Sequence, residues 1–196
     1  MPFAYGRAGR GLRHLVYVTV STGIGGGVVV DGHLLHGRQG MAGHIGHMRV
    51  AETGPVCSCG RVGCLGALAA GPALALRGQA VAAAEPMGYL GRIAGGTGIV
   101  AKHVTDGARL GDVGCLGLLQ DEARCLGRGF ASLAHLFSPE RIIMGGGVAQ
   151  AFDLMQGQLL AAFRSDAMPA FRAVDIVPAA LGDNAGLIGA ASLALA

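Results

Sequence analysis

The sequence predicts an α/β fold in a single domain, and three observations support this prediction. Short apolar, β-branched runs alternate with longer helical patterns, the longest of which covers residues 112–137. The 196 residues include 36 glycines and no tryptophan, 52% are hydrophobic and only 14% are charged. This composition is typical of small side chains packed tightly around glycine-rich loops. A chain of this length can build one hydrophobic core and is short for two.

The first predicted strand is the β-branched run at residues 15–21, which reads as buried on both faces. The glycines within 23–27 are expected to turn the chain into a second strand at 28–30. Asp31-Gly32 then gives a two-residue hairpin turn toward residues 33–36. A glycine-rich turn can present backbone N–H groups, with the hydroxyls of Ser21 and Thr22, to phosphate oxygens. A plain glycine-rich hairpin without a ligand is the alternative, and these residues alone do not decide between them.

The segment at residues 43–65, called the knuckle below, has the spacing of a metal-binding loop. Its histidine and cysteines are His47, Cys57, Cys59 and Cys64. Three thiolates and one imidazole suit tetrahedral zinc, and four protein ligands leave no open position, so the ion would be structural. The alternative is three buried thiols beside a surface histidine. Gly60 and Gly63 favour the metal site, because glycines permit the close approach of the thiolates.

The rest of the chain alternates helices with short strands. Predicted strands lie at 45–50, 141–144 and 174–177; predicted helices lie at 67–77, 97–109, 112–137, 148–163 and 184–195, with a helix and a loop within 79–98. Gly71-Pro72 would restart a helix, since proline is favoured in a first helical turn. The strand at 141–144 runs into three glycines before a helix, which places backbone N–H groups where an anion or a nucleotide could bind.

Charge and cysteine content exclude several classes of protein. The net charge of 15 − 12 = +3 is spread without a basic block, so a nucleic-acid partner is not expected. Five cysteines, of which three lie in the knuckle, fit a reducing cytosol better than a disulfide framework. No signal peptide follows Met1, and the most apolar stretch, at 65–76, is too short to span a bilayer. We therefore expect a cytoplasmic protein with no membrane partner, whose apolar composition favours a homo-oligomer.

Four motifs, in this order, resemble the signature of the ROK family, the repressors and sugar kinases built on an actin-like ATPase fold. They are Ser-Thr-Gly-Ile-Gly-Gly-Gly at 21–27, Gly-x-Ile-Gly-His at 43–47 with Cys-x-Cys-Gly-x-x-Gly-Cys-Leu at 57–65, Pro-Glu-Arg-Ile-Ile-Met-Gly-Gly-Gly at 139–147, and Leu-Gly-Asp-Asn-Ala-Gly-Leu-Ile-Gly-Ala at 181–190. The resemblance implies that residues 15–196 form the C-terminal lobe of this ribonuclease H-like fold, with the zinc knuckle at 43–65. Residues 1–14 would be a leader outside the family pattern.

ROK kinases transfer the γ-phosphoryl group of ATP to a sugar hydroxyl whose proton a carboxylate accepts. The resemblance therefore implies glucokinase-like chemistry, with ATP and Mg²⁺ as ligands beside the structural zinc. The nucleotide-binding residues would be Thr22, Gly23, Gly25, Gly26, Gly145, Gly146 and Gly147. A hexose would meet Gly40, His44 and His47, the last of which also binds the zinc ion.

The sequence departs from the family pattern at the catalytic and sugar-binding positions. The family's first lobe supplies an Asp-Gly-Gly-Thr loop and an Asn-Asp pair whose Asp is the base, and these 196 residues contain neither. Two sugar-binding glutamates of the family are replaced here by His44 and Gly66. Each lost charged hydrogen bond costs about 1–3 kcal/mol. We therefore expect this chain to be inactive as a hexose kinase on its own.

Two other functions remain open from the sequence. One is a sugar-sensing or oligomerisation module related to the ROK transcriptional repressors, which share the knuckle. The other is a degraded remnant that zinc keeps folded. Direct DNA binding is not expected, because residues 1–15 contain no helix-turn-helix.

Overall fold

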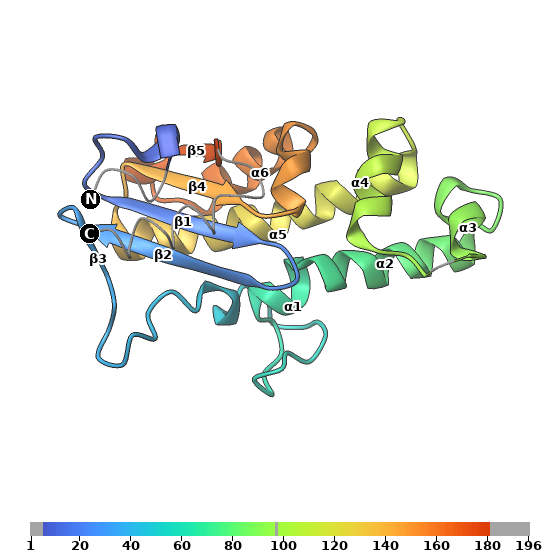
Figure 1. The fold of residues 1–196 in the computed structure, drawn as a ribbon, viewed down its shortest axis with the longest axis horizontal. Helices are drawn as coiled ribbons and strands as arrows, with labels where there is room; N and C mark the ends of the chain where they lie inside the picture. The colour runs from blue at the N-terminus through green and yellow to red at the C-terminus, as the bar shows by residue number, and fades with distance from the viewer. Residues whose placement is uncertain (1–5, 97, 181–196) are drawn as a thin grey trace.

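The computed structural model describes residues 6–96 and 98–180 and confirms the α/β prediction. A five-stranded sheet has the order β3-β2-β1-β4-β5, and the long helix α5 runs along one face of it (Figure 1). Strands β1, β2 and β3 pair antiparallel, whereas β4 is parallel to both β1 and β5. The strands are β1 (Leu15–Val20), β2 (Ile24–Val30), β3 (His33–Leu34), β4 (Arg141–Gly145) and β5 (Asp175–Pro178).

The α-helices are α1 (Leu65–Ala69), α2 (Gly71–Ala84), α3 (Tyr89–Ala94), α4 (Ala101–Arg109), α5 (Val113–Phe137) and α6 (Phe152–Asp166). Short 3-10 turns are η1 (Gly6–Gly9), η2 (Ile45–His47), η3 (Val148–Ala151) and η4 (Pro169–Phe171). Helices α2, α3 and α4 extend beyond the end of the sheet and are called the arm below (Figure 1). None of the helices within the described residues is both long and apolar enough to cross a membrane.

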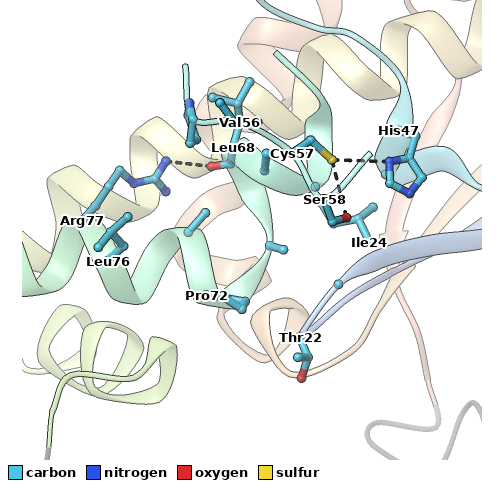
Figure 2. Close-up of a pocket in the computed structure, with 17 residues that line it drawn as sticks. Thr22, Ile24, His47, Val56, Cys57, Ser58, Leu68, Pro72, Leu76 and Arg77 are labelled. Atoms are coloured by element: carbon cyan, nitrogen blue, oxygen red, sulfur yellow. Dashed lines mark hydrogen bonds between the residues drawn. The ribbon is translucent and has the colours of Figure 1, made fainter. Parts of the chain in front are cut away.

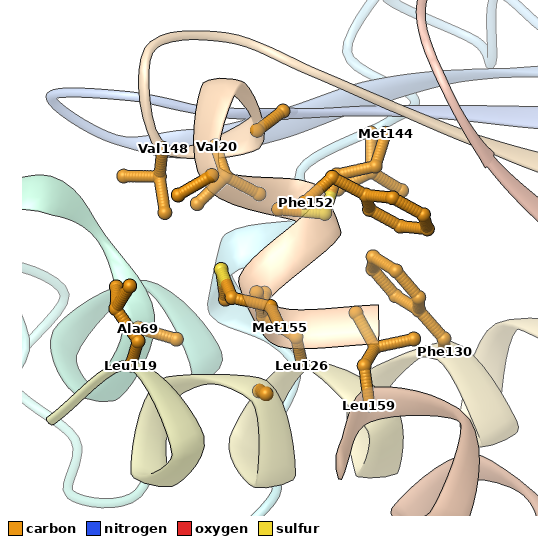
Figure 3. Close-up of a cluster of buried hydrophobic side chains, with 14 of the residues drawn as sticks. Val20, Ala69, Leu119, Leu126, Phe130, Met144, Val148, Phe152, Met155 and Leu159 are labelled. Atoms are coloured by element: carbon orange, nitrogen blue, oxygen red, sulfur yellow. The ribbon is translucent and has the colours of Figure 1, made fainter. Parts of the chain in front are cut away.

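The main core lies between the sheet and the helices α5 and α6. Val16, Val18 and Val20 alternate along β1 and point to this side, where they are fully buried. Phe130 of α5 and Phe152 of α6 fill the space beneath them (Figure 3). Helix α5 packs closely against its neighbours at two glycines. A Cβ at Gly127 would lie 2.6 Å from the Leu159 carbonyl oxygen, and at Gly129 2.7 Å from a Leu65 methyl.

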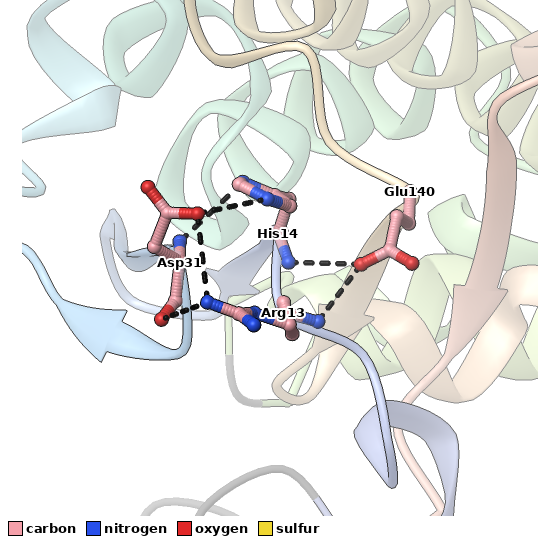
Figure 4. Close-up of polar contacts among 4 residues, drawn as sticks. All are labelled: Arg13, His14, Asp31 and Glu140. Atoms are coloured by element: carbon pink, nitrogen blue, oxygen red, sulfur yellow. Dashed lines mark hydrogen bonds and ion pairs between the residues drawn. The ribbon is translucent and has the colours of Figure 1, made fainter.

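The segment before β1 packs on the opposite face of the sheet. Ala8 and Leu12 contact the small cluster of Leu15, Val29 and Ile143. The backbone N–H groups of Arg13 and His14 donate to Glu140 Oε2 at 2.8 and 2.9 Å, and these bonds lower the pKa of Glu140 (Figure 4). The side chains of Arg13 and His14 also pair with Asp31. Asp31 has a φ of 54° and is the first residue of the two-residue hairpin turn that the sequence predicts.

Two local predictions around β2 are wrong. Residues 24–27, expected to be a turn, belong to the strand, and residues 45–47, expected to be extended, form η2. The cause is close backbone approach: a Cβ on Gly26 would clash with the Tyr17 carbonyl and the Ile45 side chain. The Gly26 N–H donates to the Gly43 carbonyl at 3.0 Å. The glycines therefore let residues 43–47 lie directly on the strand.

Within the described residues, the predicted helices are present, but they begin or end at other residues than predicted. Helix α2 restarts at Gly71 with proline in its first turn, and Asp112 caps α5 by accepting from the Cys115 N–H at 2.9 Å. The helix predicted at 148–163 begins as the 3-10 turn η3. The helix predicted at 184–195 and the motif at 181–190 lie outside the described residues.

Candidate metal centre and adjoining cleft

The four predicted zinc ligands converge in the structure. The ligand atoms of His47, Cys57, Cys59 and Cys64 all lie within 4.8 Å of one another. Cys57 Sγ is 3.4 Å from His47 Nδ1, and Cys59 Sγ is 3.6 Å from Cys64 Sγ. Tetrahedral zinc with Zn–S bonds of 2.3 Å places its sulfurs roughly 3.8 Å apart. The donor set and its spacing therefore fit a zinc ion without an open coordination position.

The knuckle closes through a few backbone contacts. Val50 N–H donates to the Gly63 carbonyl and Leu65 N–H to the Met48 carbonyl, both at 2.8 Å, so Cys64 is held opposite the segment that follows His47. Gly63 has a φ of +84°, and a Cβ there would clash with the Ala51 carbonyl. Glycine is therefore required here for the close approach of two backbone segments next to Cys64.

The thiols differ in acidity before a cation is bound. Hydrogen bonds from the backbone N–H and the side chain of Arg61 lower the pKa of Cys59 to about 6. Burial raises the pKa of Cys64 to about 11. A metal must displace the Cys64 proton, so metal affinity is expected to rise with pH.

A cavity of about 600 Å³, called the knuckle pocket, opens between the knuckle, the β1–β2 turn and the start of α2 (Figure 2). His47 and Cys57 form one wall, Thr22 lies at the turn, and Leu76 and Arg77 of α2 form the far wall. Of the predicted sugar residues only His47 lines this pocket. The exposed ring of His44 is stacked 6.1 Å from that of His47, and Gly40 is not part of the lining.

A second cavity of about 780 Å³, called the arm pocket, lies between the β1–β2 turn, the arm and η3. Its arm wall is a polar stripe on α4 at positions i, i+3, i+4 and i+7, namely Lys102, Thr105, Asp106 and Arg109. Sequence reasoning missed this stripe, although its helical spacing could have revealed it. Thr22 and Pro72 line both pockets, so the two cavities meet at the β1–β2 turn.

The predicted nucleotide-binding residues do not all line the same cavity. Thr22 and Gly147 line the arm pocket, and Gly23 lines the knuckle pocket. Gly145 and Gly146 line a smaller cavity at the ends of β4 and β5. Gly25 and Gly26 lie within β2 and line none of these cavities.

The cations that line the two pockets are all held in ion pairs. Lys102 Nζ lies 2.7 Å from Asp106 Oδ2, and Arg109 is paired with Asp153 at 3.1 Å. Arg77 pairs with the fully buried Glu122 and donates to the Leu68 carbonyl at 2.8 Å. In the described lining, each of these positive charges is therefore already partnered with a carboxylate.

We expect Gly146→Ala to lower the free energy of unfolding by at least about 2 kcal/mol, because φ is +92° there. A Cβ would also clash with the Val20 carbonyl oxygen and lie 2.9 Å from Thr19 Oγ1. Gly147→Ala is the matched control, since φ is −60° and the nearest atom would be 3.9 Å away. Urea unfolding of both variants measures the difference. Equal effects would mean that close backbone approach does not fix this loop.

Comparisons with known proteins agree with this geometry. The model of the ROK family matches residues 3–196 of the chain. A glucokinase from Thermotoga maritima is 39% identical over 190 residues, which cover 95% of this chain and 59% of that relative. The chain thus spans about 60% of the length of this relative.

Solved structures extend the likeness to three dimensions. A ROK family glucokinase from Streptomyces griseus, in complex with glucose and AMPPNP, has a TM-score of 0.85 and 36% identity, covering 95% of this chain and 62% of that chain. A ROK family transcriptional regulator homologous to the Escherichia coli MLC protein has a TM-score of 0.82 and 28% identity, covering 91% and 45%. The expected fold class is confirmed: the described residues form an α/β lobe that matches ROK glucokinase structures, with a His/Cys cluster that fits a zinc ion.

Proposed function

The chain belongs to the ROK family, and on that premise we propose that residues 15–196 form the half of a hexose kinase site that binds ATP, zinc and one side of the sugar. The junction of the two pockets at the β1–β2 turn carries this proposal. Phosphoryl transfer requires the nucleotide and the acceptor hydroxyl to meet at one point. Thr22 lines both pockets and marks that point.

The arm pocket is the proposed nucleotide site. Its volume lies within the range of small-molecule sites, and it extends from the arm to the hydroxyls of Ser21 and Thr22 and to Gly147. Because its lysine and arginine are already paired with carboxylates, the triphosphate would be held by neutral donors. Mg²⁺ bound with the nucleotide would supply positive charge against the phosphates.

The knuckle pocket is the proposed hexose site, with the imidazole of His47 on its wall. Zinc would fix the orientation of that ring and would not take part in the chemistry, since the four ligands leave it no open position. No carboxylate lines this pocket among the described residues, in keeping with Gly66 where family members carry a glutamate. We expect weaker hydrogen bonding to the sugar hydroxyls than two carboxylates would give.

Among the described residues, no unpaired carboxylate that could act as the general base lines the two pockets. Asp106 is the one carboxylate among the described residues that line the two pockets, and Lys102 holds it in an ion pair. We therefore propose that these 196 residues bind ligands without transferring phosphate, and that a carboxylate outside them completes an active kinase.

A sugar-sensing module is the second candidate. Two points favour it: His44 and Gly66 stand where the resemblance to ROK kinases implies sugar-binding carboxylates, and the chain is similar to the transcriptional regulator. This function needs hexose binding and self-association and does not need a nucleotide. The two candidates therefore differ in whether the arm pocket takes ATP.

Calorimetric titration of the zinc-loaded protein with ATP–Mg²⁺, with and without glucose, separates the candidates. We expect saturable ATP binding, weakened about 3- to 10-fold by Thr22→Val, because the variant loses one hydroxyl donor. Ser132→Ala is the control, since its hydroxyl bonds to the Arg128 carbonyl outside both pockets. Glucose binding without ATP binding would replace the kinase proposal with the sensing module.

A further inference from the structure

A bidentate ion pair joins α4, which lines the arm pocket, to α6, which follows the η3 wall of that pocket. Arg109, the last residue of α4, donates through Nη1 and Nη2 to the two carboxylate oxygens of Asp153, both at 3.1 Å. Its Nη2 also donates to the Gln150 carbonyl at 2.5 Å. Asp153 lies in the first turn of α6, and Gln150 lies in η3, which follows the glycines at 145–147. One side chain thus ties the arm to the loop on the opposite side of the pocket.

The Arg109–Asp153 pair suits a geometric role better than a stabilising one. A cation at the C-terminus of α4 and an anion at the N-terminus of α6 each complement a helix dipole, and the Arg109 hydrogen bonds lower the pKa of Asp153. The two side chains are 47% and 61% exposed, however, and pairs with such exposure contribute little to folding. A planar, two-bond contact still fixes the relative position of its partners.

The loop that Arg109 holds has its other anchor at the sheet. Gly146 packs directly against the Val20 carbonyl at the end of β1, and the Ala149 N–H donates back to the Gly146 carbonyl at 3.0 Å. Turn η3 therefore spans from β1 to the arm, with Arg109 at the arm end. Without this tie, the four residues of η3 would lose a side-chain link to α4.

We propose that Arg109 is a positioning residue for the nucleotide: it sets the spacing between α4 and η3 that the arm pocket needs to bind ATP. This inference rests on the proposed function of that pocket. The proposed role is indirect, since the bonds that Arg109 makes in this structure go to Asp153 and to the Gln150 carbonyl. The effect should therefore depend on the shape of the Arg109–Asp153 contact and not on positive charge alone.

Four variants test the proposal by calorimetry with ATP–Mg²⁺ on the zinc-loaded protein. We expect Arg109→Met and Asp153→Asn to weaken binding about tenfold, the effect of populating the binding-competent spacing about a tenth of the time. Arg109→Lys keeps the charge but cannot make the bidentate contact, and it should weaken binding similarly. Arg128→Met is the matched control: it breaks a comparably exposed pair, with Asp166, between α5 and α6 and away from the arm pocket. It should leave affinity unchanged.

Hydrogen exchange of the unliganded variants gives a second readout that does not need the nucleotide. Amides at 148–153 should exchange faster in Arg109→Met and Asp153→Asn than in the wild type and in Arg128→Met. A wild-type protein that binds no ATP would overturn the proposed function and this inference together. Normal ATP affinity in Arg109→Met or in Arg109→Lys, or unchanged exchange at 148–153, would overturn the inference alone.

Discussion

Cys64→Ser should reduce the zinc content of the purified protein from about one ion per chain to near none. Cys64 is 1% exposed and lies directly before α1, so serine would leave a buried hydroxyl where the ion needs a thiolate. Elemental analysis after gel filtration measures the change. Cys125→Ser is the control, because this half-buried thiol on α5 lies outside the ligand set and the variant should retain its zinc.

Loss of the ion should unfold the knuckle locally. Between Val50 and Cys64 the chain is mostly exposed and is joined by two isolated β-bridges, so it buries too little apolar surface to order itself. The knuckle is then stabilised by zinc binding and not by a hydrophobic core. This binding contributes about 4 kcal/mol when the free zinc concentration exceeds the Kd a thousandfold.

Trypsin reports this local unfolding, since Arg49 and Arg61 lie in the knuckle. With a chelator present, or in Cys64→Ser, cleavage after Arg61 should become fast while α5 stays protected. Equal cleavage rates with and without chelator, in a protein that does bind zinc, would show that the knuckle folds without its metal.

The parts of the fold that sequence reasoning predicted well are those carried by local patterns. The β-branched run of β1, the Asp31-Gly32 turn, the apolar spacing along α5 and the cysteine spacing of the knuckle each depend on neighbours in sequence. The break between α1 and α2 at Gly71-Pro72 belongs to the same group, because proline acts on its own turn.

The parts that were missed depend on contacts between distant segments. Gly26 lies in a strand against which the loop at 43–47 packs, and nothing within 21–30 encodes that loop. The pairs Arg109–Asp153 and Arg77–Glu122 join residues 44 and 45 positions apart. In the sequence, these charged residues cannot be told from ordinary surface residues, because only the fold brings their helices together.

The Arg77–Glu122 pair gives the second large expected effect: Arg77→Met should lower the free energy of unfolding by about 3–5 kcal/mol. Glu122 of α5 is fully buried, and Arg77 of α2 is its ion-pair partner. Methionine would fill similar space and leave the carboxylate without its partner. Glu122→Gln keeps an acceptor for Arg77 and should cost about 1 kcal/mol. Urea unfolding distinguishes the two, and equal losses would mean that packing, not the buried charge, sets the cost.

The same glutamate should make stability fall as the pH rises from about 5 to about 8. Burial raises the pKa of Glu122 from 4.5 to about 7, and the charge of Arg77 offsets this only in part. Between pH 4.5 and about 7 the carboxyl of Glu122 is protonated in the folded protein and ionised in the unfolded chain. The stability that this proton adds is therefore complete below the unfolded pKa and disappears as the pH rises through the folded pKa. The loss amounts to about 3 kcal/mol.

Glu122→Gln cannot titrate, so the difference between its unfolding free energy and that of the wild type isolates this group from the zinc ligands, which protonate in both proteins. A difference that stays constant from pH 5 to about 8 would show that Arg77 keeps Glu122 ionised throughout, and that the pair is an ordinary ion pair despite its burial.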